Sequence, residues 1–250
     1  QNYHVLYQCA GALPPELKQD LNLGEWSTYK YLNVSDKSKI EWDLFPTDCK
    51  ELIGAMESIP TVAPHVKSVW RLLAAVLHLG NAAFRGSGED DAVFASAAQI
   101  GDAARLLGCE AEQLSKALCT LNIKADLDWI AKPNTTKYAQ SAKDALSKAL
   151  YSRLFDCLVE RINESLIHGG ESRFFIGAVD IFGFECFPRN SLEQLCINFA
   201  NEKLQRMFTE AVFESVLAEY TKEGIDVQGM TFEDNSPVVA LIEGSPNGLL

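Results

Sequence analysis

The chain has 250 residues, of which 47% are hydrophobic and 22% are charged, enough for one or two domains with a sizeable core. The formal net charge of −12 and the lack of a basic tract exclude a general polyanion binder, so no nucleic-acid partner is expected. No apolar run is long enough to span a membrane, and seven scattered cysteines without a C-x-x-C pair argue against a zinc or redox centre and suit a reducing cytosol.

Helical patterns dominate residues 1–170. A helix over residues 1–10 is predicted to end at Gly11, before two prolines. Apolar residues recur every three or four positions from Val62 to Leu77, which predicts a deeply buried helix that begins near Thr61 and is closed by Gly80. Further helices are predicted from residue 47 or 48 onward, over 97–107, over 111–121 and over 138–168. The last of these carries one apolar stripe made of Leu146, Leu150, Leu154, Leu158, Ile162 and Leu166.

The segment 122–137 is predicted to be an exposed surface loop. Its charges are mixed, and Pro133 limits helix formation. Trp129 and Ile130 are apolar side chains that we expect on its surface.

A nearly unbroken apolar run from Phe174 to Val179 predicts a strand buried on both faces, as in the middle of a parallel sheet. The run ends on Asp180, and Gly183 and Glu185 follow. Ligands bind beyond the carboxyl ends of such strands, where an aspartate can hold Mg²⁺ and a glycine lets the backbone take unusual angles and approach a phosphate. The alternative is a core strand followed by a loop whose acids have no role.

A long helix is predicted to begin after Ser191, which forms a capping box with Gln194, and to end between Lys222 and Gly224. At 1.5 Å per residue it would be roughly 50 Å long, which suits a lever that carries a displacement. The alternative is a long core helix without a mechanical role. A loop over 225–236 and a helix from Val238 to Glu243 are predicted to follow.

The order Asp180-Ile-Phe-Gly-Phe-Glu185, followed by residues 190–205, resembles the switch II loop and relay helix of the myosin motor domain. Residues 2–12, 73–81 and 144–156 resemble further segments of that family in the family's order, so the resemblance covers the whole chain. It implies an α/β fold of the P-loop NTPase-like myosin head, of which this chain would be a predominantly helical part with one or a few strands of the central sheet.

The resemblance also implies a division of the chain. Residues 1–170 would form a mainly helical upper part with an actin-facing loop near 122–137. Residues 171–187 would hold a sheet strand and switch II, residues 190–224 the relay helix, and residues 225–250 the relay loop and the start of the following segment.

The roles of the family's site residues pass to matching positions. Asp180 would lie near Mg²⁺ through a water molecule, Gly183 would offer its backbone N–H to the γ-phosphate of ATP, and Glu185 would pair with a switch I arginine and position the attacking water. Loss of the phosphate would release this loop and tilt the helix behind it. The relay-helix positions singled out are Ser191, Phe199, Asn201, Glu202 and Phe208. Residues 188–189, 192 and 206–207 depart from the family's pattern, which predicts altered packing of the long helix.

The actin-facing positions implied by the resemblance are Lys124, Asp128, Trp129, Lys132 and Lys137. Asp128 stands where the family carries an acidic or phosphorylatable residue, so a negative charge would be built in. The lysines would meet acidic groups on the filament, with Trp129 as an apolar contact. The alternative is a solvated loop whose acid has no role.

The expected function is that of part of an actin-based motor that couples Mg-ATP hydrolysis to movement, in the cytoplasm and on the cytoskeleton. The sequence holds no G-x-x-x-x-G-K-[ST] pattern, so the phosphate loop and switch I are expected upstream of Gln1, and the chain alone is expected to be inactive. Expected partners are the actin filament, the remaining motor segments, and light chains on a neck outside this sequence. The alternative is a degenerate head that binds filaments or other partners without ATPase activity.

Overall fold

The computed structural model describes residues 2–33, 45–86, 93–94, 97–125, 128–167, 174, 176–227 and 234–249. The chain divides into two compact units, residues 1–170 and residues 171–250, and each is described by itself. Within the described ranges no helix combines the length and the apolar character that crossing a membrane requires.

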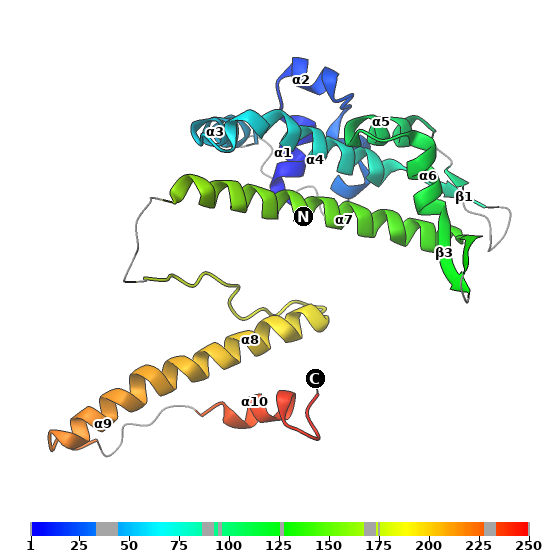
Figure 1. Cartoon of the computed structure of the whole chain (residues 1–250). Coiled ribbons are helices and arrows are strands. Elements are labelled where there is room, and N and C mark those ends of the chain that lie inside the picture. Colours follow the sequence, from blue (N-terminus) through cyan, green and yellow to red (C-terminus); the bar gives the residue numbers. More distant parts are fainter. Residues whose placement is uncertain are drawn as a thin grey trace. The chain divides into compact units, whose positions relative to one another are not determined.

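Helices dominate the first unit (Figure 1). Its α-helices are α1 (His4–Gly11), α2 (Pro15–Asp20), α3 (Phe45–Ser58), α4 (Val66–Asn81), α5 (Ala97–Leu107), α6 (Ala111–Cys119) and α7 (Thr136–Leu166). Short 3₁₀ turns connect them at η1 (Trp26–Thr28), η2 (Lys30–Leu32) and η4 (Ala63–His65). Two antiparallel hairpins complete the unit: β1 (Phe84–Arg85) with β2 (Val93–Phe94), and β3 (Thr120–Ala125) with β4 (Asp128–Pro133).

Helix α4 is the centre of this unit, as its apolar repeat predicts. It packs against α1, α5 and α7, and every residue from Leu73 to Gly80 is buried. Trp70 is also completely buried in the main core. Gly80 is required by packing, because a Cβ at this position would lie 2.5 Å from Cδ2 of Tyr31. The helix thus brings the 3₁₀ turn η2 directly against its last turn.

A buried polar cluster joins α4 to α7. The hydroxyl of Tyr31 donates to Oδ1 of Asp144 at 2.5 Å, and Nζ of the buried Lys143 donates to the carbonyl oxygen of Gly80 at 3.2 Å. Burial lowers the pKa of Lys143, although the adjacent Asp144 opposes this shift. Burial pushes the pKa of Asp144 upward, but hydrogen bonds from Tyr31 and Gln140 and the charge of Lys143 outweigh it and leave the pKa below its ordinary value.

Helix α7 uses only part of its predicted stripe. Leu150, Leu154, Leu158 and Ile162 pack against the main core. Leu166 is 64% exposed, so its predicted place in the stripe is wrong. The reason is geometric: residues four apart are separated by 400° on a helix, so a strict i, i+4 row drifts by about 40° at each step. After several steps the row has left the face that contacts α4.

The predicted loop over 122–137 is a β-hairpin. Helix α6 ends at Cys119, two residues before the predicted end, and Thr120 takes extended backbone angles. Strand β3 then alternates Leu121 and Ile123 with polar residues, and this period-two pattern favours a strand. Cross-strand pairing with β4 satisfies backbone groups that a loop would leave to water.

The helix α3 begins at Phe45, so Asp48 lies inside its first turn and the start predicted at residue 47 or 48 is too late. The predicted helix over 97–107 has the bounds of α5. The polar stretch 85–91 has the composition of a loop, and its residues from 87 onward lie outside the described residues.

The second unit is built on one long helical rod. It runs as α8 (Leu192–Phe208), the π-helical segment η5 (Thr209–Glu214) and α9 (Ser215–Lys222), and α10 (Ser236–Glu243) packs against α8 (Figure 1). Gly224 follows with a φ of +78°, a left-handed conformation that suits glycine after a helix. The predicted helix and its stop signal are therefore confirmed, with a π-helical interruption that the apolar pattern does not reveal.

The strand predicted from Phe174 to Val179 is not formed in the described residues 174 and 176–179. Phe174, Ile176 and Val179 are 88%, 98% and 78% exposed, instead of buried on both faces. A strand needs a neighbour to pair its backbone groups, and the two hairpins of the described chain pair only with themselves. The described part of the segment is therefore extended chain without a ladder.

Candidate functional site

The loop that carries Asp180, Gly183 and Glu185 is fastened to α8 by side-chain amides. The backbone N–H of Glu185 donates to Oδ1 of Asn198 at 2.8 Å, and Nδ2 of Asn198 donates back to the carbonyl oxygen of Glu185 at 2.8 Å. The oxygen and the nitrogen of the Asn198 side-chain amide are thus both hydrogen-bonded to the backbone of Glu185. This pairing makes the position of Glu185 depend on the second turn of α8.

Two more asparagines hold the same loop. Nδ2 of Asn201 donates to the carbonyl oxygen of Phe182 at 2.8 Å, directly before Gly183. Farther along, Asn190 and Phe187 exchange hydrogen bonds of 2.8 and 2.9 Å. Asn198 and Asn201 therefore hold the loop on α8, and Asn190 braces the loop within itself.

Gly183 lies in open space. A Cβ there would meet no atom within 4 Å, and its φ lies outside the left-handed region. Gly183 therefore does not use the conformational freedom of glycine in this structure, and its role toward a phosphate stays a prediction. The surroundings leave space in which a phosphate oxygen could reach the backbone N–H.

Asp180 is exposed and Glu185 is half-buried. Among the described residues no three His, Cys, Asp or Glu side chains come together in a way that could hold a metal ion. Mg²⁺ bound to nucleotides commonly takes only one or two protein carboxylates and fills its other positions with phosphates and water. The carboxylates here fit such a partial role, with Asp180 as the predicted contributor.

Helix α8 begins at Leu192, and Ser191 is its N-cap, as predicted. The backbone N–H of Ser191 donates to Oε1 of Gln194 at 2.9 Å, which is one half of the capping box. The Ser191 hydroxyl can give its single proton to the Glu193 carboxylate or to Oε1 of Gln194, and the predicted capping box of Ser191 and Gln194 is present. The carboxylate of Glu193 in the first turn also suits the positive end of the helix dipole.

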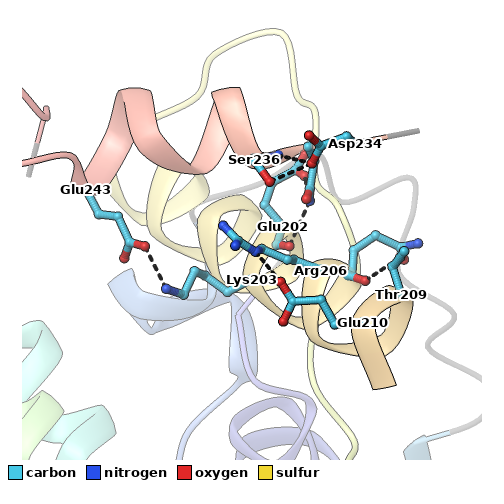
Figure 2. A network of polar contacts seen from close by, with 10 residues as sticks. Glu202, Lys203, Arg206, Thr209, Glu210, Asp234, Ser236 and Glu243 are labelled. Carbon is cyan, nitrogen blue, oxygen red and sulfur yellow. Dashed lines mark hydrogen bonds and ion pairs between the residues drawn. The ribbon is translucent and has the colours of Figure 1, made fainter. Parts of the chain in front are cut away.

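Helix α10 is held on α8 by the polar contacts of Figure 2. Lys203 forms an ion pair with Glu243 at 2.7 Å, and Nδ2 of Asn235 donates to the Glu202 carboxylate at 2.6 Å. Figure 2 also shows Asp234 receiving hydrogen bonds from Ser236, which hold the pKa of this aspartate below its ordinary value. The predicted position Glu202 therefore contacts the segment that leads into α10.

We call the contacts Lys203–Glu243 and Glu202–Asn235 the clasp; beyond them the rod passes from α-helix into the π-helical segment η5. Arg206 pairs with Glu210 at 2.7 Å across the start of η5, and this contact raises the pKa of the arginine (Figure 2). Phe208, the last residue of α8, is exposed, whereas Phe199 is half-buried with Nζ of Lys203 6.0 Å from its ring centre. The clasp contacts only the part of the rod that precedes the π-helical segment.

The predicted actin-facing residues come together on and beside the hairpin β3–β4. Lys124 pairs in register with Trp129, and Ala125 pairs with Asp128. Lys132 is exposed on β4, and Lys137 is exposed in the first turn of α7. The pairing also places Leu121, Ile123 and Ile130 on one face, where all three are exposed. The hairpin thus presents a small apolar face that the sequence pattern alone did not identify.

Asn190 and Asn198 are the site residues that the sequence reasoning missed. Asparagine is a poor helix former because its side chain competes for nearby backbone groups. Asn198 and Asn201 both lie inside α8 and both donate to the preceding loop. Two asparagines within one predicted helix were therefore a signal that another segment of the chain is hydrogen-bonded to that helix.

Comparison with known proteins covers the whole chain. The family described as myosin head (motor domain) matches residues 1–250. The chain is similar to unconventional myosin-XV of Homo sapiens (38% identity, all of this chain, 7% of that protein). It is also similar to Myosin-2 of Arabidopsis thaliana (40% identity, all of this chain, 21% of that protein) and to unconventional myosin-Vc of Homo sapiens (38% identity, 97% of this chain, 14% of that protein).

The chain therefore spans no more than about a fifth of the length of these relatives. The match nevertheless runs through both structural units, from the helical residues 1–170 to the rod and α10. A family match over every residue, together with identities of 38% to 40%, shows that this chain belongs to the myosin head (motor domain) family.

Proposed function

We propose that this chain is the part of an actin-based, Mg-ATP-driven motor that transmits the state of the nucleotide to a long helix. The observation that carries the proposal is the reciprocal pair of hydrogen bonds between Asn198 and the backbone of Glu185. Because this pair fastens the loop to α8, a displacement of the loop would be passed to the rod. Membership of the family supplies the class of reaction.

Three residues of the loop would act on the nucleotide. The open space around Gly183 supports a role for its N–H as a donor to the terminal phosphate. Asp180 would contribute to holding Mg²⁺, and Glu185 would position the attacking water. Bound Mg²⁺ neutralises charge on the phosphates, so the protein's task is chiefly positioning and charge stabilisation.

The part of the rod that precedes η5, helix α8, would respond to release of the phosphate. Phe182 and Glu185 flank Gly183 and are both held by α8, so release of the phosphate would free the loop and its two attachment points together. The clasp from α10 would keep the part of the rod before η5 together with that helix. We therefore assign residues 171–187 to the switch II segment, residues 190–224 to the relay helix, and residues 225–250 to the relay loop and the start of the next segment of the motor.

The hairpin β3–β4 would contact the filament. Its exposed apolar face, formed by Leu121, Ile123 and Ile130, offers surface to bury, and Lys132 on the same face offers a charge that suits an acidic partner. Lys124 lies near the tip on the opposite face, from which it would reach the filament past the edge of the hairpin. Lys137 lies just beyond β4 at the start of α7. The backbone register puts Asp128 and Trp129 near the tip of the same hairpin.

Actin co-sedimentation tests the filament contact in a motor domain that contains this chain. Ile123 is 43% exposed, so its full burial on binding would contribute about 1 kcal/mol, or roughly fivefold in affinity, and Ile123→Ser should lose it. Asn122→Ser, on the opposite face of the same strand, is the matched control. Equal affinity of the two variants for actin would show that the apolar face does not take part in the interface.

The motor and the degenerate binder are separated by ATPase measurements on the same motor domain. A motor should hydrolyse Mg-ATP and accelerate when actin filaments are added, whereas a binder should co-sediment without turnover. The 250-residue chain alone should not hydrolyse ATP, because its sequence holds no phosphate-loop pattern. Tight binding of a fluorescent ATP analogue to this chain would contradict that expectation.

A further inference from the structure

A groove of about 320 Å³ lies in the first unit where α4, α5 and α7 meet. Its floor is apolar and includes Leu106, Leu154 and Leu158. Three arginines line it as well: Arg71 from α4, and Arg153 and Arg161 from α7. None of the residues proposed for the nucleotide or the filament belongs to this groove.

The charge of the groove is opposite to that of the chain. The chain carries a formal net charge of −12, yet the described residues that line the groove include three arginines and no aspartate or glutamate. Within the described part of the structure none of the three arginines forms an ion pair. Arg71 and Arg153 are exposed and Arg161 is half-buried, so their charged groups are available to a ligand.

The arginines are spread out rather than focused on one point. Arg153 and Arg161 are eight residues apart on α7, which separates them by about 12 Å along the helix axis. An extended peptide rises about 3.3 Å per residue, so acidic side chains four residues apart would match this distance. A single phosphate could not meet both arginines, whereas a peptide with leucines between its acids could also cover the apolar floor.

From this arrangement we propose that the groove binds an extended acidic segment of a partner protein, with carboxylates about four residues apart and leucine-like side chains between them. The arginines would pair with the carboxylates, and the leucines of the floor would receive the apolar side chains. Arginine suits this role because its planar group can make paired hydrogen bonds to a carboxylate. The partner is thereby defined by charge and spacing.

The test uses a fluorescein-labelled peptide of sequence Glu-Ser-Leu-Ser-Glu-Ser, whose two glutamates and central leucine lie on one side of an extended chain, and fluorescence anisotropy with the 250-residue chain. We expect saturable binding that weakens as salt is added. The triple variant Arg71→Gln, Arg153→Gln, Arg161→Gln should bind roughly fivefold more weakly, as expected for the loss of two exposed ion pairs with the two glutamates. Lys67→Gln is the matched control, because Lys67 is exposed on α4 but does not line the groove.

A second readout locates the bound peptide and does not depend on variants. Cys157 is an exposed free thiol that lines the groove, whereas Cys109 is an exposed free thiol outside it. Bound peptide should slow the alkylation of Cys157 by iodoacetamide and leave Cys109 unchanged, as measured by mass spectrometry. This comparison stays valid even where the triple variant proves unstable.

Several results would overturn the proposal. Equal binding of the peptide in which lysine replaces glutamate would show that charge does not select the ligand. Unchanged alkylation of Cys157 would place the peptide elsewhere. Arginine-dependent binding to phosphatidylserine vesicles without peptide binding would assign the groove to a membrane surface. Binding to this chain but not to a motor domain containing it would show that the groove is covered within the protein itself.

Discussion

Replacing Asn198 by alanine should release the loop that carries Asp180, Gly183 and Glu185 from α8 without weakening the helix. The substitution removes both hydrogen bonds to the backbone of Glu185, each of 2.8 Å. Such bonds contribute about 0.5–1.5 kcal/mol each, so the pair is worth about 1–3 kcal/mol to the position of the loop. Alanine is a better helix former than asparagine by about half a kcal/mol, so any loosening of the loop cannot come from a weaker helix.

Hydrogen exchange followed by mass spectrometry measures this effect directly on the 250-residue chain. A loss of about 1.4 kcal/mol should make exchange of the Glu185 amide, followed in the peptide covering residues 182–187, roughly tenfold faster. The matched control is Gln205→Ala, an exposed position of the same helix, which should leave that peptide unchanged. In an active motor domain the Asn198 variant should also lose coupling, so that ATP still binds while actin activation falls.

Equal exchange in the two variants would refute the reasoning. It would mean that the loop is held by other contacts, or that the hydrogen bonds to Glu185 do not limit its opening. A loss of actin activation in the Asn198 variant without faster exchange would show that Asn198 acts in the motor by another route than its hydrogen bonds to Glu185. In either case the hydrogen bonds between Asn198 and Glu185 would no longer support the proposed function.

Three further predictions concern single positions. Gly183→Ala, whose Cβ would meet no atom within 4 Å, should leave folding intact. Its methyl group would keep the terminal phosphate away from the backbone N–H, so single-turnover ATP hydrolysis in a motor domain should slow roughly a hundredfold while nucleotide still binds. Normal cleavage would contradict the assigned role. Gly80→Ala should lower the free energy of unfolding in urea by about 1–3 kcal/mol, because its Cβ would lie 2.5 Å from Tyr31, whereas Gly101→Ala, in open space, should not. Asp144 has a folded-state pKa below 3.8, so its contribution is present above pH 3.8 and is lost as pH falls through the folded-state value. Asp144→Asn should therefore destabilise the chain in urea at pH 7 and cost progressively less in strongly acidic solution; a pH-independent loss would exclude the ionised carboxylate as the cause.

Much of the helical framework follows from local patterns. The apolar repeat before Gly80 locates the buried helix α4, and residues 97–107 form α5 with the predicted bounds. Ser191 caps the start of the rod, and Gly224, with its left-handed backbone, follows its end. These features could be predicted because helix formation depends on residues only three or four positions apart.

The strands show the opposite behaviour. The run from Phe174 to Val179 has the composition of a buried strand, yet its described residues are exposed and belong to no sheet. The segment 120–133 was predicted as partly helix and partly loop, yet it forms a hairpin. Strand formation depends on a partner that can lie anywhere in the sequence, so composition alone decides neither the existence of a strand nor its neighbour.

The sequence by itself determined the family, the helical framework and the candidate residues Asp180, Gly183 and Glu185, because these depend on residue identity and short-range order. Only the tertiary structure decided that Asn198 and Asn201 hold the loop and that three arginines share one groove. Such contacts join residues that are distant in the chain, and which polar groups meet is settled only when the backbone has folded and each buried or half-buried group has found its partner.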